Sequence, residues 1–160
     1  MSRGKCLIIG FGSDALSDDG LPIRLINDLK AILDPDKFIL MTSPVGGLEL
    51  LNLLDGFNTA VLIDTQLTSK RKPGVIHKFT PDNFEETFHL SSQHDVYFHE
   101  ALRLGSEMGI SMPDDIHIVA IEIVENKKLS FEFSDEIREK YQSILSYLCR
   151  ILKRMSGPDV

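Results

Sequence analysis

The stretch CLIIGFGSDALSDDG, residues 6–20, gives the clearest indication of the fold class of the chain. It opens with an uninterrupted apolar run that ends in glycine, which is typical of a strand buried on both faces of a parallel sheet. A helical pattern follows, with Leu21, Leu25, Leu29 and Ile32 spaced along one face. The stretch therefore predicts a strand that passes through a glycine turn into a covering helix.

The same alternation continues along the first part of the chain. Apolar runs of strand length occupy residues 37–41 and 59–64, and a helical pattern with Leu48, Leu51 and Leu54 lies between them. This β-α-β-α-β order requires right-handed crossovers and helices that cover a parallel sheet.

The rest of the chain supplies two more strands and further helices. Thr80 and Pro81 are a suitable N-cap and first residue for a short helix, and Ser134 is a suitable N-cap for the last helix. Of the remaining elements, an edge strand after a Pro-Gly turn is expected at residues 72–79 and a helix at 94–108. A core strand is expected at 114–123 and the last helix at 134–154. We predict a three-layer α/β/α sandwich of the phosphorylase/hydrolase-like kind, with a mostly parallel, twisted sheet of about five strands and one antiparallel edge strand. Residues 1–155 form a single domain in this interpretation, and residues 156–160 form a flexible tail.

Charge and composition exclude several classes of partner. The formal net charge of −7 argues against binding to nucleic acid or to an anionic membrane, which requires a basic face. The densest basic run, residues 70–72, is expected to be a solvated loop. No apolar stretch approaches the length of a membrane span, so a cytoplasmic protein is expected. Cys6 and Cys149 form no metal or redox motif and are expected to be buried, inert thiols.

The glycine turn has two possible explanations. Gly10 and Gly12 after a strand, with Ala15 three residues on, fit a permissive dinucleotide-binding pattern. However, Asp18 and Asp19 stand at the start of the following helix, where they would repel a pyrophosphate. Helix capping by these acids, with Asp18 as the cap and Asp14 as a solvated turn residue, is the simpler structural interpretation.

Position in the sheet gives Asp19 a further role. Loops after parallel strands emerge at one carboxyl edge, where Asp19 follows the first strand and Asp64 is the last residue of the third apolar run. His94 stands at the entrance of a predicted helix, whereas His89 is interpreted as a loop residue. Two carboxylates and one imidazole would form an open site for zinc, nickel, iron or manganese.

The ordered motifs resemble the hydrogenase maturation proteases, which trim a C-terminal extension from the large subunit of nickel-iron hydrogenase. Gly10–Gly20 is similar to the family's glycine- and acid-containing opening, except that Ser13 and Ala15 replace an asparagine and a leucine. The stretches GGLELLNLLDGFNTAVLIDT (46–65), KPGVIHKFTPDNF (72–84) and SSQHD (91–95) resemble its later motifs.

The resemblance implies that Asp19, Asp64 and His94 are the metal-binding and catalytic residues of an endopeptidase. The metal would be the nickel of the precursor, for which zinc or cadmium could substitute, and the partner would be a hydrogenase large-subunit precursor or a related metalloprotein. A substrate-selecting segment of the family is not matched at residues 42–45, so that only Gly46 and Gly47 remain of this recognition loop. A noncatalytic module that binds a metalloprotein precursor, or a nucleotide-binding protein, are the alternatives.

Overall fold

The computed structural model describes residues 4–44, 46–84, 87–90 and 98–155. Its strands are β1 (Cys6–Phe11), β2 (Phe38–Ser43), β3 (Thr59–Gln66), β4 (Ile76–Phe79) and β5 (Asp115–Glu122). Its helices are α1 (Leu21–Lys30), α2 (Glu49–Leu54), α3 (Phe98–Glu107) and α4 (Asp135–Met155), with short 3-10 turns η1 (Ser17–Gly20) and η2 (Pro81–Asn83). Within these described ranges, no helix is both long and apolar enough to cross a membrane.

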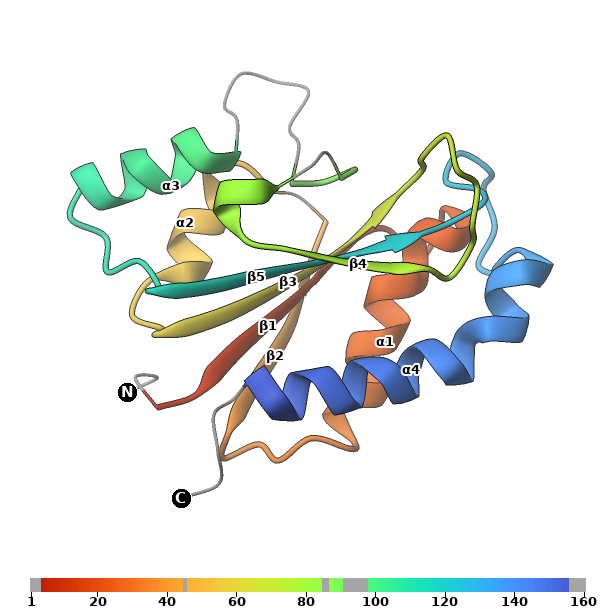
Figure 1. The fold of residues 1–160 in the computed structure, drawn as a ribbon, viewed down its shortest axis with the longest axis horizontal. Coiled ribbons are helices and arrows are strands. Elements are labelled where there is room, and N and C mark those ends of the chain that lie inside the picture. Colours follow the sequence, from red (N-terminus) through yellow and green to blue (C-terminus); the bar gives the residue numbers. More distant parts are fainter. Residues whose placement is uncertain (1–3, 45, 85–86, 91–97, 156–160) are drawn as a thin grey trace.

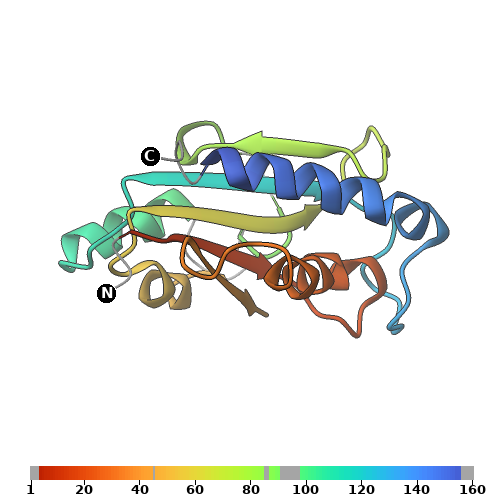
Figure 2. The ribbon, with the colours of Figure 1, turned by 90° about the horizontal axis from the view of Figure 1, so that it is seen from below.

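The five strands form one sheet in the order β2-β1-β3-β5-β4, with β4 antiparallel to β5 and all other pairs parallel. Helices α1 and α4 cover one face, and α2 and α3 cover the other (Figure 1). The view turned by 90° shows α4 running along the sheet (Figure 2). The mostly parallel sheet with one antiparallel strand is confirmed.

Each face of the sheet has its own apolar core because every strand alternates its side chains between the two faces. Ile63 and Ile121 pack with the helices α1 and α4, whereas Leu62 and Ile118 pack on the side of α2 and α3. The continuous apolar runs of β1 and β3 are buried throughout, as expected for central parallel strands. The polar residues at the carboxyl edge of the sheet are therefore held by a rigid scaffold.

Several boundaries differ from the sequence-based expectations. Strand β3 does not end at Asp64 but continues to Gln66, because its pairing with β5 extends to the Gln66–Glu122 register. Ile32 and Leu48 are exposed rather than buried, since α1 ends at Lys30 and α2 begins only at Glu49. The expected start of α3, residues 94–97, and the tail at 156–160 lie outside the described residues.

The expected helix caps are present at two places. Thr80 and Asn83 form a capping box at η2. The Ser134 hydroxyl accepts a hydrogen bond from the Ile137 amide at 3.4 Å, at the start of α4. These contacts confirm the two N-caps that the sequence indicated.

Candidate active site at the carboxyl edge of the sheet

Asp64 is a fully buried carboxylate near the carboxyl end of β3. Its Oδ1 accepts hydrogen bonds from the Thr65 amide at 2.8 Å and from His89 Nδ1 at 2.8 Å. Its Oδ2 accepts bonds from the Thr87 hydroxyl at 2.8 Å and from the amides of His89 at 2.7 Å and Leu90 at 3.0 Å. Five donors therefore converge on one carboxylate, which fixes residues 87–90 over the sheet edge.

Asp19 reaches the same region from the turn between β1 and α1. Its side chain is nearly fully buried, and Oδ2 accepts a hydrogen bond from the Ser13 amide at 2.9 Å. Thr65, next to Asp64 on β3, donates its hydroxyl to Asp19 Oδ1 at 3.4 Å. Asp19 is thus tied both to its own loop and to the strand that carries Asp64.

Gly12 makes this path of the chain possible. Its φ of +155° lies in a region that side-chain-bearing residues rarely adopt, and an added Cβ would lie 2.0 Å from the Asp19 carbonyl oxygen. The loop amides are also already used, because the Gly12 amide donates to the Ser43 carbonyl at 3.2 Å and the Ser13 amide donates to Asp19. The glycine turn therefore positions an acid, and this use of its amides argues against the dinucleotide alternative.

His89 joins the two acids. Its Nδ1 lies 2.8 Å from Asp64 Oδ1, and its Nε2 lies 3.5 Å from Asp19 Oδ2. Burial alone would lower the pKa of His89, but hydrogen bonds and charge interactions with Asp19 and Asp64 outweigh it and raise the pKa to about 10. His89 is therefore an imidazolium near neutral pH, and its positive charge compensates two buried carboxylates.

The expected site residues have different outcomes. Asp19 and Asp64 come together at the carboxyl edge, where both contact the His89 ring. His94 lies outside the described residues, so its role stays a prediction. Sequence reasoning missed His89, which it treated as a loop residue, and also Thr87; no spacing pattern marks either, and only the tertiary path of residues 87–90 brings them to Asp64.

Asp18 has a different role from the expected helix cap. Its buried carboxylate accepts hydrogen bonds from the amides of Val124, Glu125 and Ser134 and from the Ser134 hydroxyl, at 2.7–3.1 Å. No side-chain cap is formed at η1 or α1. Asp18 thus attaches the segment after β5 to the glycine turn, whereas Asp14 is exposed, as expected.

Gly46 lies beside the same region. A Cβ at Gly46 would be 2.3 Å from the His89 carbonyl oxygen, so the absence of a side chain allows close packing against residues 87–90. Gly47 has φ +68° and open space where its Cβ would be. The glycine pair of the expected recognition loop therefore adjoins the segment that carries His89.

The described residues do not contain a complete set of metal ligands. Among residues 4–44, 46–84, 87–90 and 98–155, no group of three or more His, Cys, Asp or Glu side chains could hold a metal ion. At the carboxyl edge, the His89 ring and four other donors engage Asp64. Asp19 has fewer donors and is the more available carboxylate.

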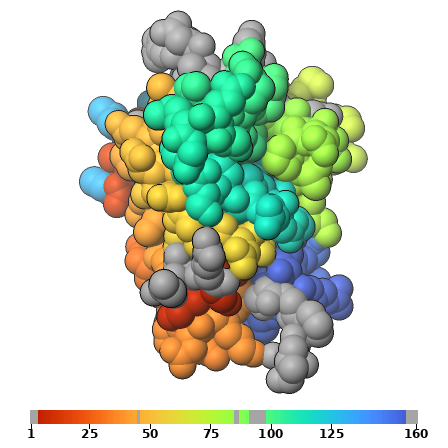
Figure 3. Space-filling view, turned by 90° about the vertical axis from the view of Figure 1, so that its left-hand side faces the viewer, coloured from red at the N-terminus to blue at the C-terminus, as the bar shows by residue number. Residues whose placement is uncertain are grey.

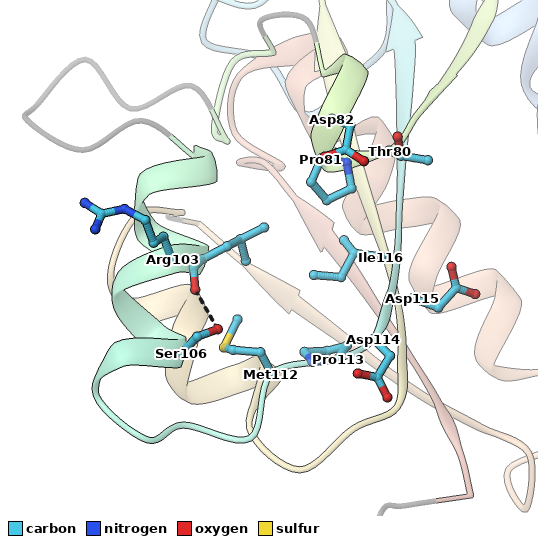
Figure 4. Close-up of a pocket in the computed structure, with 11 residues that line it drawn as sticks. Thr80, Pro81, Asp82, Arg103, Ser106, Met112, Pro113, Asp114, Asp115 and Ile116 are labelled. Carbon is cyan, nitrogen blue, oxygen red and sulfur yellow. Dashed lines mark hydrogen bonds between the residues drawn. The ribbon is translucent and has the colours of Figure 1, made fainter.

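A separate cavity lies at the opposite, amino edge of the sheet. It has a volume of about 470 Å³ and lies between α3, η2 and the start of β5 (Figure 4). Figure 3 views the molecule from this end, where α3 and the beginning of β5 adjoin. Its lining includes Asp82, Asp114 and Asp115 but none of the residues around Asp64. The cavity is therefore distinct from the carboxylate site.

Comparison with known sequences assigns the family. A family model described as hydrogenase maturation protease matches residues 23–151, which is most of the chain. The chain belongs to the hydrogenase maturation protease family. It is thus a hydrolase of the endopeptidase class, and its family acts on hydrogenase large-subunit precursors. No curated protein matches the chain.

Solved structures show the same fold at low sequence identity. The hydrogenase maturating endopeptidase HybD from E. coli is 18% identical, with a TM-score of 0.73 over 94% of this chain and 93% of that chain. The maturation protease HycI from Thermococcus kodakarensis KOD1 is 19% identical, with a TM-score of 0.65 over 94% of each chain. HybD from Thermococcus kodakarensis is 22% identical, with a TM-score of 0.59 over 96% of this chain and 99% of that chain.

Proposed function

We propose that this hydrolase is a metal-dependent endopeptidase that removes a C-terminal peptide from a nickel-containing hydrogenase large-subunit precursor. Family membership supports the reaction class. The observation that carries the proposal is the meeting of two buried carboxylates, Asp19 and Asp64, on one imidazole at the carboxyl edge of the sheet. Ligand sites of open parallel sheets lie at this edge.

The proposed ligands are Asp19, Asp64 and His94, and the metal they engage is the nickel carried by the precursor. Two carboxylate oxygens and one imidazole nitrogen suit a borderline divalent ion, so zinc or cadmium should also be accepted. Asp19 fits this role best, because in the described ranges its oxygens accept one short hydrogen bond, from the Ser13 amide, and two longer contacts, from the Thr65 hydroxyl and His89 Nε2. A bound divalent ion would supply Lewis-acid polarisation of the scissile carbonyl.

His89 has a supporting role in this proposal. Two buried carboxylates that lie close together are unfavourable without a compensating positive charge, and the His89 imidazolium supplies it in the free enzyme. A divalent cation of the substrate would replace that charge. Asp64 Oδ2 would then keep its bonds to the amides of His89 and Leu90. Asp64 Oδ1 would lose its contact with the His89 ring and bind the metal in its place.

Gly46 and Gly47 form the proposed substrate-recognition loop. Gly46 packs against the His89 carbonyl, which brings this loop to the edge where the precursor would bind.

The test is cleavage of the large-subunit precursor encoded with this protein, loaded with nickel. Wild-type protein should produce a shortened large subunit, and Asp19→Ala and His94→Ala should abolish the product. Asp14→Ala is a matched control, because Asp14 is an exposed acid of the same turn and should leave the rate unchanged. His89→Ala should reduce activity together with stability, since it removes the counter-charge without removing a proposed ligand.

Two results would contradict the proposal. An unshortened precursor that nevertheless binds would identify a noncatalytic binding module. Full activity of Asp19→Ala would show that the carboxylate pair is not the active site.

A further inference from the structure

A strongly basic loop lies next to the carboxylate site and has no part in the chemistry described above. The β3–β4 loop, residues 67–75, leaves β3 directly after Gln66 and includes Lys70, Arg71 and Lys72. All three cations are exposed, and the described part of the chain places no acidic side chain within ion-pair distance of any of them. Figure 1 shows this loop in yellow-green beyond the carboxyl ends of β3 and β5.

The loop is a structured element. At its beginning, Glu122 Oε1 accepts bonds from the Thr68 amide at 2.7 Å and the Thr68 hydroxyl at 3.0 Å. At its end, the Gly74 amide donates to the Glu122 carbonyl at 2.8 Å, and the Glu122 amide donates to the Val75 carbonyl at 2.9 Å. One buried residue at the tip of β5 therefore holds both ends of the loop.

The centre of the loop is also constrained. The Arg71 amide donates to the Thr68 carbonyl at 3.3 Å, and Arg71 has a φ of +45°, which non-glycine residues adopt only at an energetic cost. Lys140 of α4 donates to the Pro73 carbonyl at 2.7 Å and adds a further cation at the base of the loop. The fold thus presents several positive charges on a loop whose backbone is held in place, on a protein whose net charge is −7.

Distance along the chain places these charges within reach of a substrate bound at Asp64. Lys70 follows Asp64 by six residues, so their Cα atoms are at most about 22 Å apart. A standard protein interface covers about 800 Å² on each partner, a patch roughly 28 Å across. An interface of this width that includes the carboxylate site is therefore wide enough to include the β3–β4 loop as well.

We propose that the β3–β4 loop is a docking element for an acidic surface segment of the substrate protein beside the scissile bond. This inference rests on the proposed function for the identity of the substrate. Charge complementarity selects the partner, because exposed cations on an otherwise acidic enzyme attract a carboxylate-rich surface and orient it during encounter. The loop and the active site are adjacent along the chain, since β3 carries Asp64 and leads into the loop.

The experiment compares two charge-reversed variants. Lys70→Glu with Lys72→Glu changes the loop, and Lys30→Glu with Arg154→Glu makes the same change in net charge at exposed residues in the last turns of α1 and α4. Association with the immobilised nickel-loaded precursor and cleavage of that precursor are both measured at about 0.02 M and about 0.5 M salt. Thermal unfolding checks that both variants are folded.

The loop variant should bind the precursor about tenfold more weakly at low salt and raise KM to the same extent, with kcat little changed. At high salt its affinity should approach that of the wild type, and the control should match the wild type throughout. Equal effects of the two variants, or a loss that persists at high salt, would overturn the docking inference. Salt-sensitive binding through the loop without any cleavage would instead overturn the proposed endopeptidase activity and leave the docking surface standing.

Discussion

Replacement of Asp64 by asparagine should destabilise the protein strongly although the two side chains have nearly the same shape. The aspartate is fully buried and accepts five hydrogen bonds, from Thr65, Thr87, Leu90 and, twice, His89. An asparagine has one acceptor oxygen, which can serve the Oδ2 donors. Its amide group then faces the Thr65 amide and the His89 ring, where both positions require an acceptor.

The expected magnitude follows from the two hydrogen bonds that asparagine cannot accept. One buried backbone donor without a partner costs about 1–3 kcal/mol, and loss of the charged bond to His89 adds about 1.5–3 kcal/mol. We therefore expect Asp64→Asn to lower the free energy of unfolding by about 2.5–6 kcal/mol near neutral pH. Asp55→Asn is the matched control, because Asp55 is exposed and accepts the Ser111 amide, and its replacement should change the free energy of unfolding by less than about 1 kcal/mol.

The pH dependence of this difference identifies its source. The folded pKa of His89, about 10, lies above the ordinary histidine value of 6.5. The stabilisation by protonated His89 is therefore fully present below pH 6.5. It is lost as pH rises from 6.5 through about 10. The stability difference between wild type and Asp64→Asn, measured by urea unfolding, should therefore shrink across this window. A difference below about 0.5 kcal/mol at neutral pH, or one that does not vary with pH, would contradict this role of Asp64.

Three further predictions concern other parts of the turn and core. Gly12→Ala should destabilise the protein by more than about 2 kcal/mol in urea unfolding, because the added Cβ would lie 2.0 Å from the Asp19 carbonyl oxygen. If the variant were as stable as the wild type, the turn would have to relax freely around the added methyl group. Asp18→Ala should cost about 2–4 kcal/mol, since it leaves donors of Val124, Glu125 and Ser134 without their acceptor, and an effect as small as that of Asp14→Ala would argue against this role. Burial and the nearby charge of Asp115 raise the pKa of Cys6 to about 12, so its alkylation, followed by mass spectrometry, should require unfolding; rapid labelling of the native protein at pH 8 would contradict this.

Much of the fold could be predicted because the apolar runs carry two kinds of information. Their continuity indicates strands buried on both faces, and the helical spacing between them indicates covering helices. The errors occur at element ends. Ile32 and Leu48 continue the helical spacing in the sequence, yet both are exposed because the hydrogen-bonded helices stop short of them.

The candidate site was predictable only where strand direction determines position. Asp19 and Asp64 follow from the rule that loops after parallel strands share one edge. The role of Asp18 could not be inferred, because its partners lie 106–116 residues away in the sequence. His89 was missed for a similar reason, since the four bonds from Thr87, His89 and Leu90 to Asp64, and not any local pattern, determine where residues 87–90 lie.

The most direct test of the proposed function is the intact mass of the hydrogenase large-subunit precursor after incubation with this protein, with and without nickel in the precursor. We expect one discrete loss of mass, equal to a C-terminal peptide, in the nickel-loaded precursor alone. An unchanged mass for the nickel-loaded precursor, or equal cleavage of the nickel-free form, would contradict it.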